Sequence, residues 1–338
     1  MAEGVVEIRR GGRVESVVRA DGVVVDSAGR VVAGFGHPHR ETYWRSSAKP
    51  FQAVPVVLSG AAAQFQMDAR DVAMVAASHS GEPRHTTRVE RLLQRAGLTA
   101  ADLACGVHWP KHAATAHAMR RAGLKPSPLH HNCSGKHAGM LLTAAARGVA
   151  TAGYLEPDHP VQQTIRDVVA HFTGIAAPRL ATGVDGCGVP TFYLPLSRMA
   201  WAYARLYDGR GLPDDEAAAG QLVAEAMRTH PELVSGEGRL ETRLAEATEG
   251  RILSKGGAEG VYCGALPERG WGVAIKIDDG GTRARGSLVA AVLSLLPVLA
   301  EETRTRLATL AVEPIHNDAG RPVGEMMPIV ELQWGQVR

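Results

Sequence analysis

A serine and a lysine stand three residues apart where the first helix-like segment of the chain begins. In Ser46-Ser47-Ala48-Lys49, residues i and i+3 share one helix face, so the Ser46 hydroxyl and the Lys49 amine can meet while Ser47 points elsewhere. A partly desolvated lysine amine loses its proton near neutral pH and can then accept the serine proton, which makes that oxygen a nucleophile. The structural alternative is an exposed helix start, with Ser46 as the N-cap and Lys49 in water.

Two further polar islands lie in segments that we expect to be helical or to border helices. Ser78 opens the cluster Ser-His-Ser-Gly-Glu at 78–82, which follows an apolar helical run; its structural alternative is a helix C-cap with a turn. The stretch His-Asn-Cys-Ser-Gly-Lys-His at 131–137 precedes another helix. Ser134 as the N-cap explains one residue of that stretch. It does not explain a cysteine, a lysine and two histidines beside it.

Two glycine-rich islands complete the set. Between 183 and 190, three glycines and a proline surround Asp185 and Cys187, which indicates a backbone in unusual geometry that presents both side chains to a partner. Lys255 precedes two glycines between two strand-like segments, where a ligand could approach an edge strand closely. A simple hairpin turn is the alternative for Lys255.

The composition is that of a globular protein with a large core. Of the 338 residues, 45% are hydrophobic and 21% are charged. The 37 basic and 35 acidic residues give a formal net charge of +2, and the basic residues are scattered, which argues against a nucleic acid partner. The N-terminus has no basic region followed by an apolar run, and no apolar stretch nears the roughly 20 residues that span a bilayer. We therefore expect a cytoplasmic protein with no membrane partner.

The cysteines are too few and too widely spaced for the disulfide framework of a secreted protein. We expect reduced thiols or metal ligands instead. Cys105 and Cys263 match no chemical role, and we expect both to be buried like small apolar residues.

The hydrophobic pattern predicts an α+β fold. Residues 5–36 alternate between β-branched and polar types with turn signals, which is typical of about four antiparallel strands. Helical spacing follows near 49–59, 85–96, 134–147, 161–171, 196–206, 214–228 and 240–249. Strand patterns return near 251–254, 260–265 and 271–277, before helices near 286–296 and 301–310 and a short tail. We predict a sheet domain of 1–45 and 250–338 that carries the C-terminal helices, an inserted helical domain of 46–249, and an active site at their junction.

The motifs together resemble a known family. The order Ser-x-x-Lys, a serine-bearing loop and Lys-Gly-Gly is that of the penicillin-binding and serine β-lactamase superfamily. The match is sharper with the Rhizobium-type, thermolabile bacterial L-asparaginases, and it covers nearly the whole chain. It is carried by RSSAKP at 45–50, ASHSGE at 77–82, NCSGKH at 132–137, GVDGCG at 183–188 and KGGAEG at 255–260. The resemblance implies a β-lactamase/DD-peptidase/glutaminase-like fold with three αβα layers.

This resemblance implies hydrolysis of L-asparagine to L-aspartate and ammonia by two Ser-Lys pairs. Ser46 would pair with Lys49, and Ser78 with Lys255. One serine would form an acyl-enzyme that water then cleaves, while the second pair relays protons. Helix spacing favours Ser46 as the attacking serine, because it ties Ser46 to Lys49 without any tertiary contact.

The same resemblance implies a metal site and a homodimer. Cys133, Lys136 and Cys187 would be ligands of a zinc ion near the serines, with water completing the site. We further infer that Asp185 holds the substrate α-ammonium group and that Arg45 holds its α-carboxylate. No organic cofactor is implied.

Three alternatives remain at this point. The chain could be a glutaminase or another small-amide amidohydrolase of the same fold. A D-Ala-D-Ala peptidase or β-lactam binder is disfavoured, because Gly256 replaces the hydroxyl residue that commonly follows the lysine and Cys133-Ser134-Gly135 replaces Ser-x-Asn. A non-catalytic small-molecule or zinc-binding protein on this scaffold is the third.

Overall fold

The computed structural model describes residues 2–335, which form two compact units. The sheet unit comprises the segments up to Ser47, Leu194–Asp208 and from Leu244 onward, and the helical unit comprises Ala48–Tyr193 and Gly209–Arg243. The segment 194–208, which the sequence prediction included in the helical insertion, therefore groups with the sheet.

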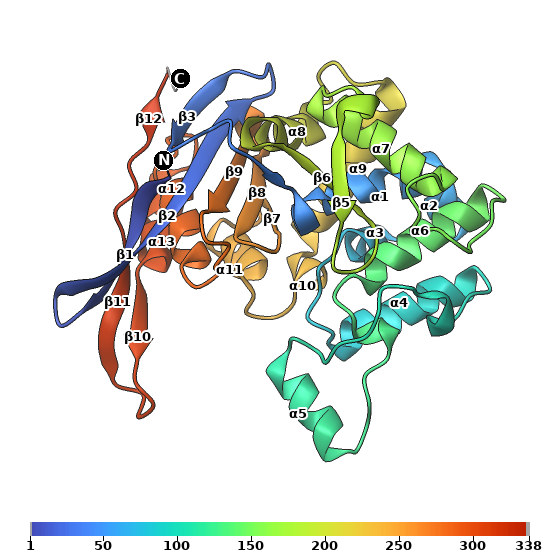
Figure 1. Ribbon diagram of the computed structural model, residues 1–338, viewed down its shortest axis with the longest axis horizontal. Helices are drawn as coiled ribbons and strands as arrows, with labels where there is room; N and C mark the ends of the chain where they lie inside the picture. The colour runs from blue at the N-terminus through green and yellow to red at the C-terminus, as the bar shows by residue number, and fades with distance from the viewer. Residues whose placement is uncertain (1, 336–338) are drawn as a thin grey trace. The chain divides into compact units, whose positions relative to one another are not determined.

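The sheet unit pairs N-terminal strands with C-terminal ones. Within the described residues its sheet has nine strands, with the order β10-β11-β1-β2-β9-β8-β7, while β3 pairs with β2 and β12. The blue and red strands lie side by side in Figure 1. The strands are β1 (Glu3–Arg10), β2 (Arg13–Asp26), β3 (Val31–Phe35), β7 (Leu253–Gly256), β8 (Val261–Leu266), β9 (Trp271–Ile277), β10 (Glu313–His316), β11 (Pro322–Pro328) and β12 (Gln333–Trp334). These antiparallel pairings confirm the predicted α+β class and a sheet built from both ends of the chain.

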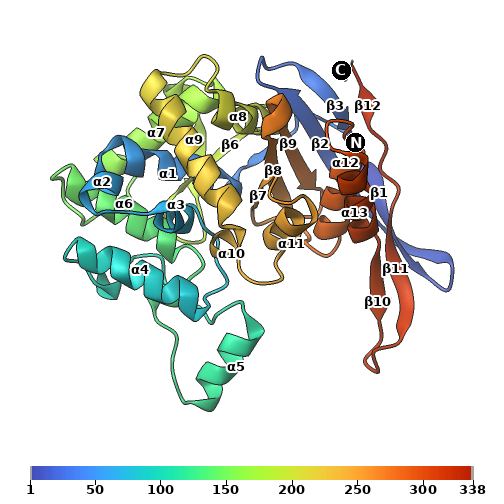
Figure 2. The same ribbon diagram turned by 180° about the vertical axis from the view of Figure 1, so that it is seen from behind.

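The helices of the sheet unit bury the strands. Both faces of β9 are buried, and α8 (Leu196–Asp208) packs so closely on it that a Cβ on Gly272 would overlap the carbonyl oxygen of Ala200. Two further helices, α12 (Arg285–Ser294) and α13 (Glu301–Ala311), lie side by side (Figure 2) and contact β11. The predicted short tail was wrong, because β10 and β11 form a hairpin at 313–328.

The helical unit is built around α1 (Lys49–Leu58) and α6 (Ser134–Ala146). Helix α1 packs against α6, α7 and α9, and α6 also contacts α3 and α4. The other elements are α2 (Ala61–Gln64), α3 (Ala69–Val75), α4 (Pro83–Arg95), α5 (Ala113–Arg121), α7 (Pro160–Thr173), α9 (Asp214–Thr229), α10 (Pro231–Val234) and the hairpin of β5 (Ala181–Val184) with β6 (Pro190–Pro195). Helix α11 (Leu240–Ala247) begins at the end of this unit. The predicted helices near 49–59, 85–96 and 134–147 are confirmed within a few residues.

No helix within residues 2–335 is both long enough and apolar enough to cross a membrane.

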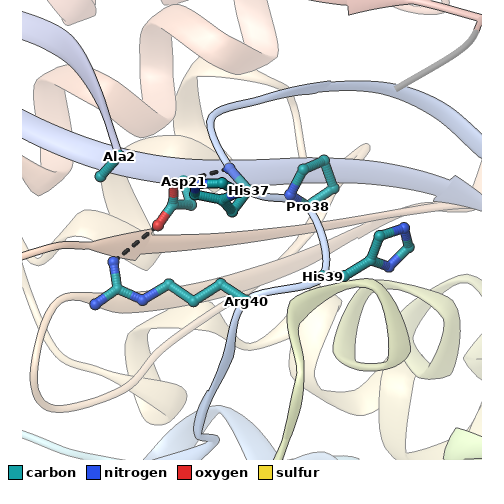
Figure 3. Close-up of a pocket in the computed structure, with 6 residues that line it drawn as sticks. All are labelled: Ala2, Asp21, His37, Pro38, His39 and Arg40. Atoms are coloured by element: carbon teal, nitrogen blue, oxygen red, sulfur yellow. Dashed lines mark hydrogen bonds and ion pairs between the residues drawn. The ribbon is translucent and has the colours of Figure 1, made fainter. Parts of the chain in front are cut away.

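A buried carboxylate in the sheet unit fixes the loop that leads towards Ser46. Asp21 on β2 accepts hydrogen bonds from the backbone N–H of His37, at 2.9 Å, and from the Arg40 guanidinium, at 2.8 Å (Figure 3). Arg40 also donates to Asp278 at 2.6 Å. Asp21, His37 and Arg40 border a cavity of about 410 Å³. The loop continues into β4 (Glu41–Tyr43) and the 3₁₀ turn of Arg45–Ala48.

Replacing Asp21 with alanine is expected to lower the free energy of unfolding by about 2–4 kcal/mol. The largely buried Arg40 guanidinium would lose one of its two carboxylate partners, and the backbone N–H of His37 would lose its acceptor. Urea unfolding followed by circular dichroism measures this loss. Asp278→Ala is the matched control, since the Asp278 side chain is 49% exposed and its pair with Arg40 should contribute less than about 1 kcal/mol. Equal losses in the two variants would contradict the structural role of Asp21.

Candidate active site

Lys49 opens helix α1 and is completely buried. Its Nζ lies within hydrogen-bond distance of the Ala77 carbonyl oxygen, of Ser78 Oγ at 2.7 Å and of Cys133 Sγ at 3.2 Å. Burial lowers the pKa of Lys49, although the nearby Cys133 thiolate acts in the opposite direction. Lys49 is therefore desolvated, as a lysine that accepts a proton from serine must be.

These three contacts allow Lys49 to act as a base. A neutral amine has two N–H groups and one lone pair. If the Ala77 carbonyl and Cys133 Sγ accept the two N–H groups, the lone pair faces the Ser78 hydroxyl, which can then donate its proton to Nζ. A serine and a buried amine in hydrogen-bond contact can generate a nucleophile.

Two cysteines and a second buried lysine lie beside this pair. Lys136 Nζ donates to Cys187 Sγ at 3.0 Å, and Cys187 Sγ lies 3.6 Å from Asp185 Oδ2. The hydrogen bond from Cys187 lowers the pKa of Cys133 well below its usual value, and the positive charges of Lys49 and Lys136 add to the effect. The same hydrogen bond raises the pKa of Cys187. Cys133 is therefore the more acidic of the two thiols.

The cluster of Cys133, Lys136 and Cys187 has the donor atoms of a metal site. Two sulfur atoms and one amine nitrogen suit a borderline-soft divalent cation. Burial opposes the charged form of Lys136, but the Cys187 and Cys133 charges outweigh it and raise its pKa, so a bound cation would have to displace that proton. In the described part of the chain, no three residues drawn from His, Cys, Asp and Glu form a possible metal site. Any metal held here therefore depends on the lysine.

The backbone brings these side chains together at a glycine. Helix α6 begins directly after Cys133 and carries Lys136 in its first turn. A Cβ on Gly135 would overlap the carbonyl oxygen of Met74 near the end of α3, so the two backbones are in direct contact. The chain then runs from α3 to Ser78, whose N–H donates to the Val234 carbonyl at 2.8 Å.

Replacing Gly135 with alanine is expected to cost about 1–3 kcal/mol of stability, because the new methyl group forces the first turn of α6 away from α3. Thermal unfolding measures this loss. Gly186→Ala is the control from the loop beside Cys187, since a Cβ there meets no atom within 4 Å. A Gly135→Ala variant as stable as Gly186→Ala would contradict the close approach.

The other predicted site residues belong to the sheet unit. Ser46 is half-buried in the 3₁₀ turn before α1. Arg45 in the same turn has a left-handed φ of 53°, and its guanidinium lies 4.0 Å from the Glu259 carboxylate. Lys255 on β7 is completely buried, and its Nζ donates to the Gly256 carbonyl at 2.7 Å.

Both Ser-Lys pairings taken from the sequence join residues of different units. The pairs Ser46 with Lys49 and Ser78 with Lys255 therefore stay predictions. The contact between Lys49 and Ser78 was not foreseen. A second unforeseen contact involves Ser47, whose hydroxyl donates to the Lys255 carbonyl at 2.9 Å and so holds the strand that carries this lysine.

The structure tests the predicted N-cap at Ser134 and the predicted burial of Cys105 and Cys263. The predicted N-cap at Ser134 was wrong: Cys133 occupies the N-cap position, and the Ser134 hydroxyl donates to the Leu129 carbonyl at 2.9 Å. Cys105 and Cys263 are buried as predicted, and burial raises the pKa of each thiol to about 12. Both thiols are therefore protonated at neutral pH.

Comparison with known proteins gives one match to a protein family. The family described as L-asparaginase II matches residues 6–328. No curated protein matches the sequence. Among solved structures, a β-lactamase from Mycobacterium bovis is 15% identical with a TM-score of 0.42, over 81% of this chain and 94% of that chain. A mutant of simvastatin synthase from Aspergillus terreus is 12% identical with a TM-score of 0.42, over 86% of this chain and 91% of that chain.

Proposed function

Because this chain belongs to the L-asparaginase II family, it is an amidohydrolase with a small-molecule substrate; from this premise, we propose that it hydrolyses L-asparagine to L-aspartate and ammonia. The observation that supports the proposal most directly is the 2.7 Å contact between the buried Lys49 amine and the Ser78 hydroxyl. An amide requires both a strong nucleophile and an acid that protonates the departing nitrogen, and a Ser-Lys pair supplies both.

In the proposed reaction, Lys49 moves protons and Ser78 carries the acyl group. Neutral Lys49 accepts the Ser78 proton while Ser78 Oγ bonds to the side-chain carbonyl carbon of asparagine. The Lys49 ammonium then returns the proton to the leaving nitrogen, the C–N bond breaks, and ammonia departs from an ester on Ser78. Water cleaves this ester, with Lys49 accepting its proton and returning it to Ser78.

Ser46 and Lys255 enter the proposal on the family resemblance, which pairs Ser46 with Lys49 and Ser78 with Lys255. Helix spacing favours Ser46 as the attacking serine, whereas the Lys49 contact favours Ser78. Mass spectrometry of acid-quenched enzyme during turnover decides between them, because the aspartyl ester adds mass to one serine peptide. We expect the ester on Ser78; an ester on Ser46 would assign Ser78 to proton relay.

The substrate and metal roles complete the proposal. Asp185 and Arg45 would bind the α-ammonium and α-carboxylate groups of asparagine. Cys133, Lys136 and Cys187 would hold a zinc ion, and their two sulfur atoms and one amine fit this metal. When bound, zinc would supply a positive charge that polarises and orients a polar group of the substrate. A homodimer is proposed on the family resemblance.

Ammonia release from purified enzyme tests the function. The expected value of kcat/KM is at least about tenfold higher with L-asparagine than with L-glutamine, since one extra methylene changes discrimination by this order. A clear preference for glutamine would assign the glutaminase function. Release of ammonia from neither amide would favour a binding protein.

A further inference from the structure

A buried histidine beside the cysteine–lysine cluster has one nitrogen without a partner. His137 is completely buried, and its Nε2 has no hydrogen-bond partner among the described residues. An unsatisfied buried donor or acceptor costs about 1–3 kcal/mol. Such a group is therefore retained in a core only where another interaction offsets the cost, so His137 requires an explanation.

The other nitrogen of the ring is held by a chain of hydrogen bonds. Tyr154 Oη accepts the N–H of Ala104 at 2.9 Å and lies 2.7 Å from His137 Nδ1. Burial raises the pKa of Tyr154, so the phenol keeps its proton. Nδ1 is the only hydrogen-bond acceptor in contact with Tyr154 Oη among the described residues, so the phenol donates its proton to Nδ1.

This chain of hydrogen bonds decides the tautomer of His137. A ring whose Nδ1 accepts a hydrogen bond is neutral and carries its proton on Nε2. The unpartnered atom is therefore an N–H donor. The two ring nitrogens point in roughly opposite directions, so this donor points away from Tyr154.

The helix places that donor on the side of the cluster. Cys133 precedes α6 directly, and Lys136 and His137 lie three and four positions later, so all three belong to one face. Helical side chains lean towards the N-terminus of their helix, which for His137 is the side of Cys133. The backbone N–H of His137 donates to the Cys133 carbonyl at 3.0 Å.

We propose that His137 is a positioning residue of the Cys133–Lys136–Cys187 cluster: since neither cluster sulfur is its partner, its Nε2–H donates a hydrogen bond to the non-protein ligand that completes the metal-loaded cluster, and Tyr154 fixes the tautomer that carries this proton. The inference rests on the proposed zinc site. Groups in this outer position orient metal ligands, and their loss typically weakens metal binding 10–100-fold.

The test is zinc affinity, measured by competition with a chromophoric chelator on the full-length protein. His137→Phe keeps the ring and removes the donor, and at least tenfold weaker zinc binding is expected. His137→Gln offers an amide N–H near the position of Nε2, and zinc affinity within about threefold of the unaltered protein is expected. His85→Phe is the matched control, since both nitrogens of this buried histidine are already paired, with the Glu82 N–H at 3.2 Å and the Glu232 carbonyl at 2.9 Å.

A second readout is independent of zinc and of catalysis. Nitrogen-15 NMR of histidine-labelled protein is expected to show the His137 proton on Nε2, and a redistribution between the two nitrogens in Tyr154→Phe. The proposal is overturned if the proton lies on Nδ1, if the unaltered protein binds no zinc, or if His137→Phe binds zinc normally. Failure of asparagine hydrolysis with these zinc and NMR results intact would overturn the proposed function alone.

Discussion

Replacing Lys49 with methionine is expected to lower kcat for asparagine hydrolysis by at least about 10³-fold, because it removes the only proton acceptor in contact with Ser78 among the described residues. Methionine has a similar length and no charge. Replacing a buried charged group with an apolar side chain of similar volume is often neutral for stability. The loss of rate should therefore not reflect unfolding. Steady-state ammonia release together with circular dichroism measures both quantities.

Lys276→Met is the matched control for this prediction. Lys276 is also buried, lies on β9 and donates to the Ile277 carbonyl, and it has no part in the proposed chemistry. The same chemical change there should leave kcat within about threefold of the unaltered enzyme. Turnover by Lys49→Met at a normal rate would refute the Ser-Lys mechanism.

Joint replacement of Cys133 and Cys187 with alanine is expected to abolish stoichiometric zinc binding, because only the Lys136 amine remains as a donor in the cluster. Metal analysis after dialysis should fall from one zinc ion per chain to a trace. Asparagine turnover should fall by at least about tenfold if zinc orients the substrate. Removal of zinc from the unaltered protein with a chelator should give the same loss, reversible on zinc addition.

Cys263→Ala provides the control for thiol loss. This cysteine is equally buried, on β8 of the sheet unit, and is not a member of the Cys133–Lys136–Cys187 cluster. Its replacement should retain zinc and activity at a small cost in stability. Zinc retained by the double variant and lost from Cys263→Ala would reverse the assignment of the ligands.

Local patterns in the sequence were sufficient for most elements of the fold. The helices at 49–58 and 134–146 and the strand at 271–277 follow directly from the spacing of their apolar residues. The β10–β11 hairpin was missed because β10 is short, both strands contain prolines and most of their residues are half-buried, so they lack a buried alternating face. The N-cap at Ser134 was misassigned because its hydroxyl bonds to Leu129, a preference that the local sequence does not reveal.

Candidate chemical residues could likewise be proposed from the chain, but the contact between Lys49 and Ser78 could not. Spacing along a helix relates Ser46 to Lys49, because those residues are covalently close. Ser78 lies 29 positions from Lys49, and their contact depends on the backbone approach of Gly135 to Met74, which sets α3 against α6. Residue type and period are local properties of a sequence. A hydrogen bond between distant side chains is decided only when the helices pack.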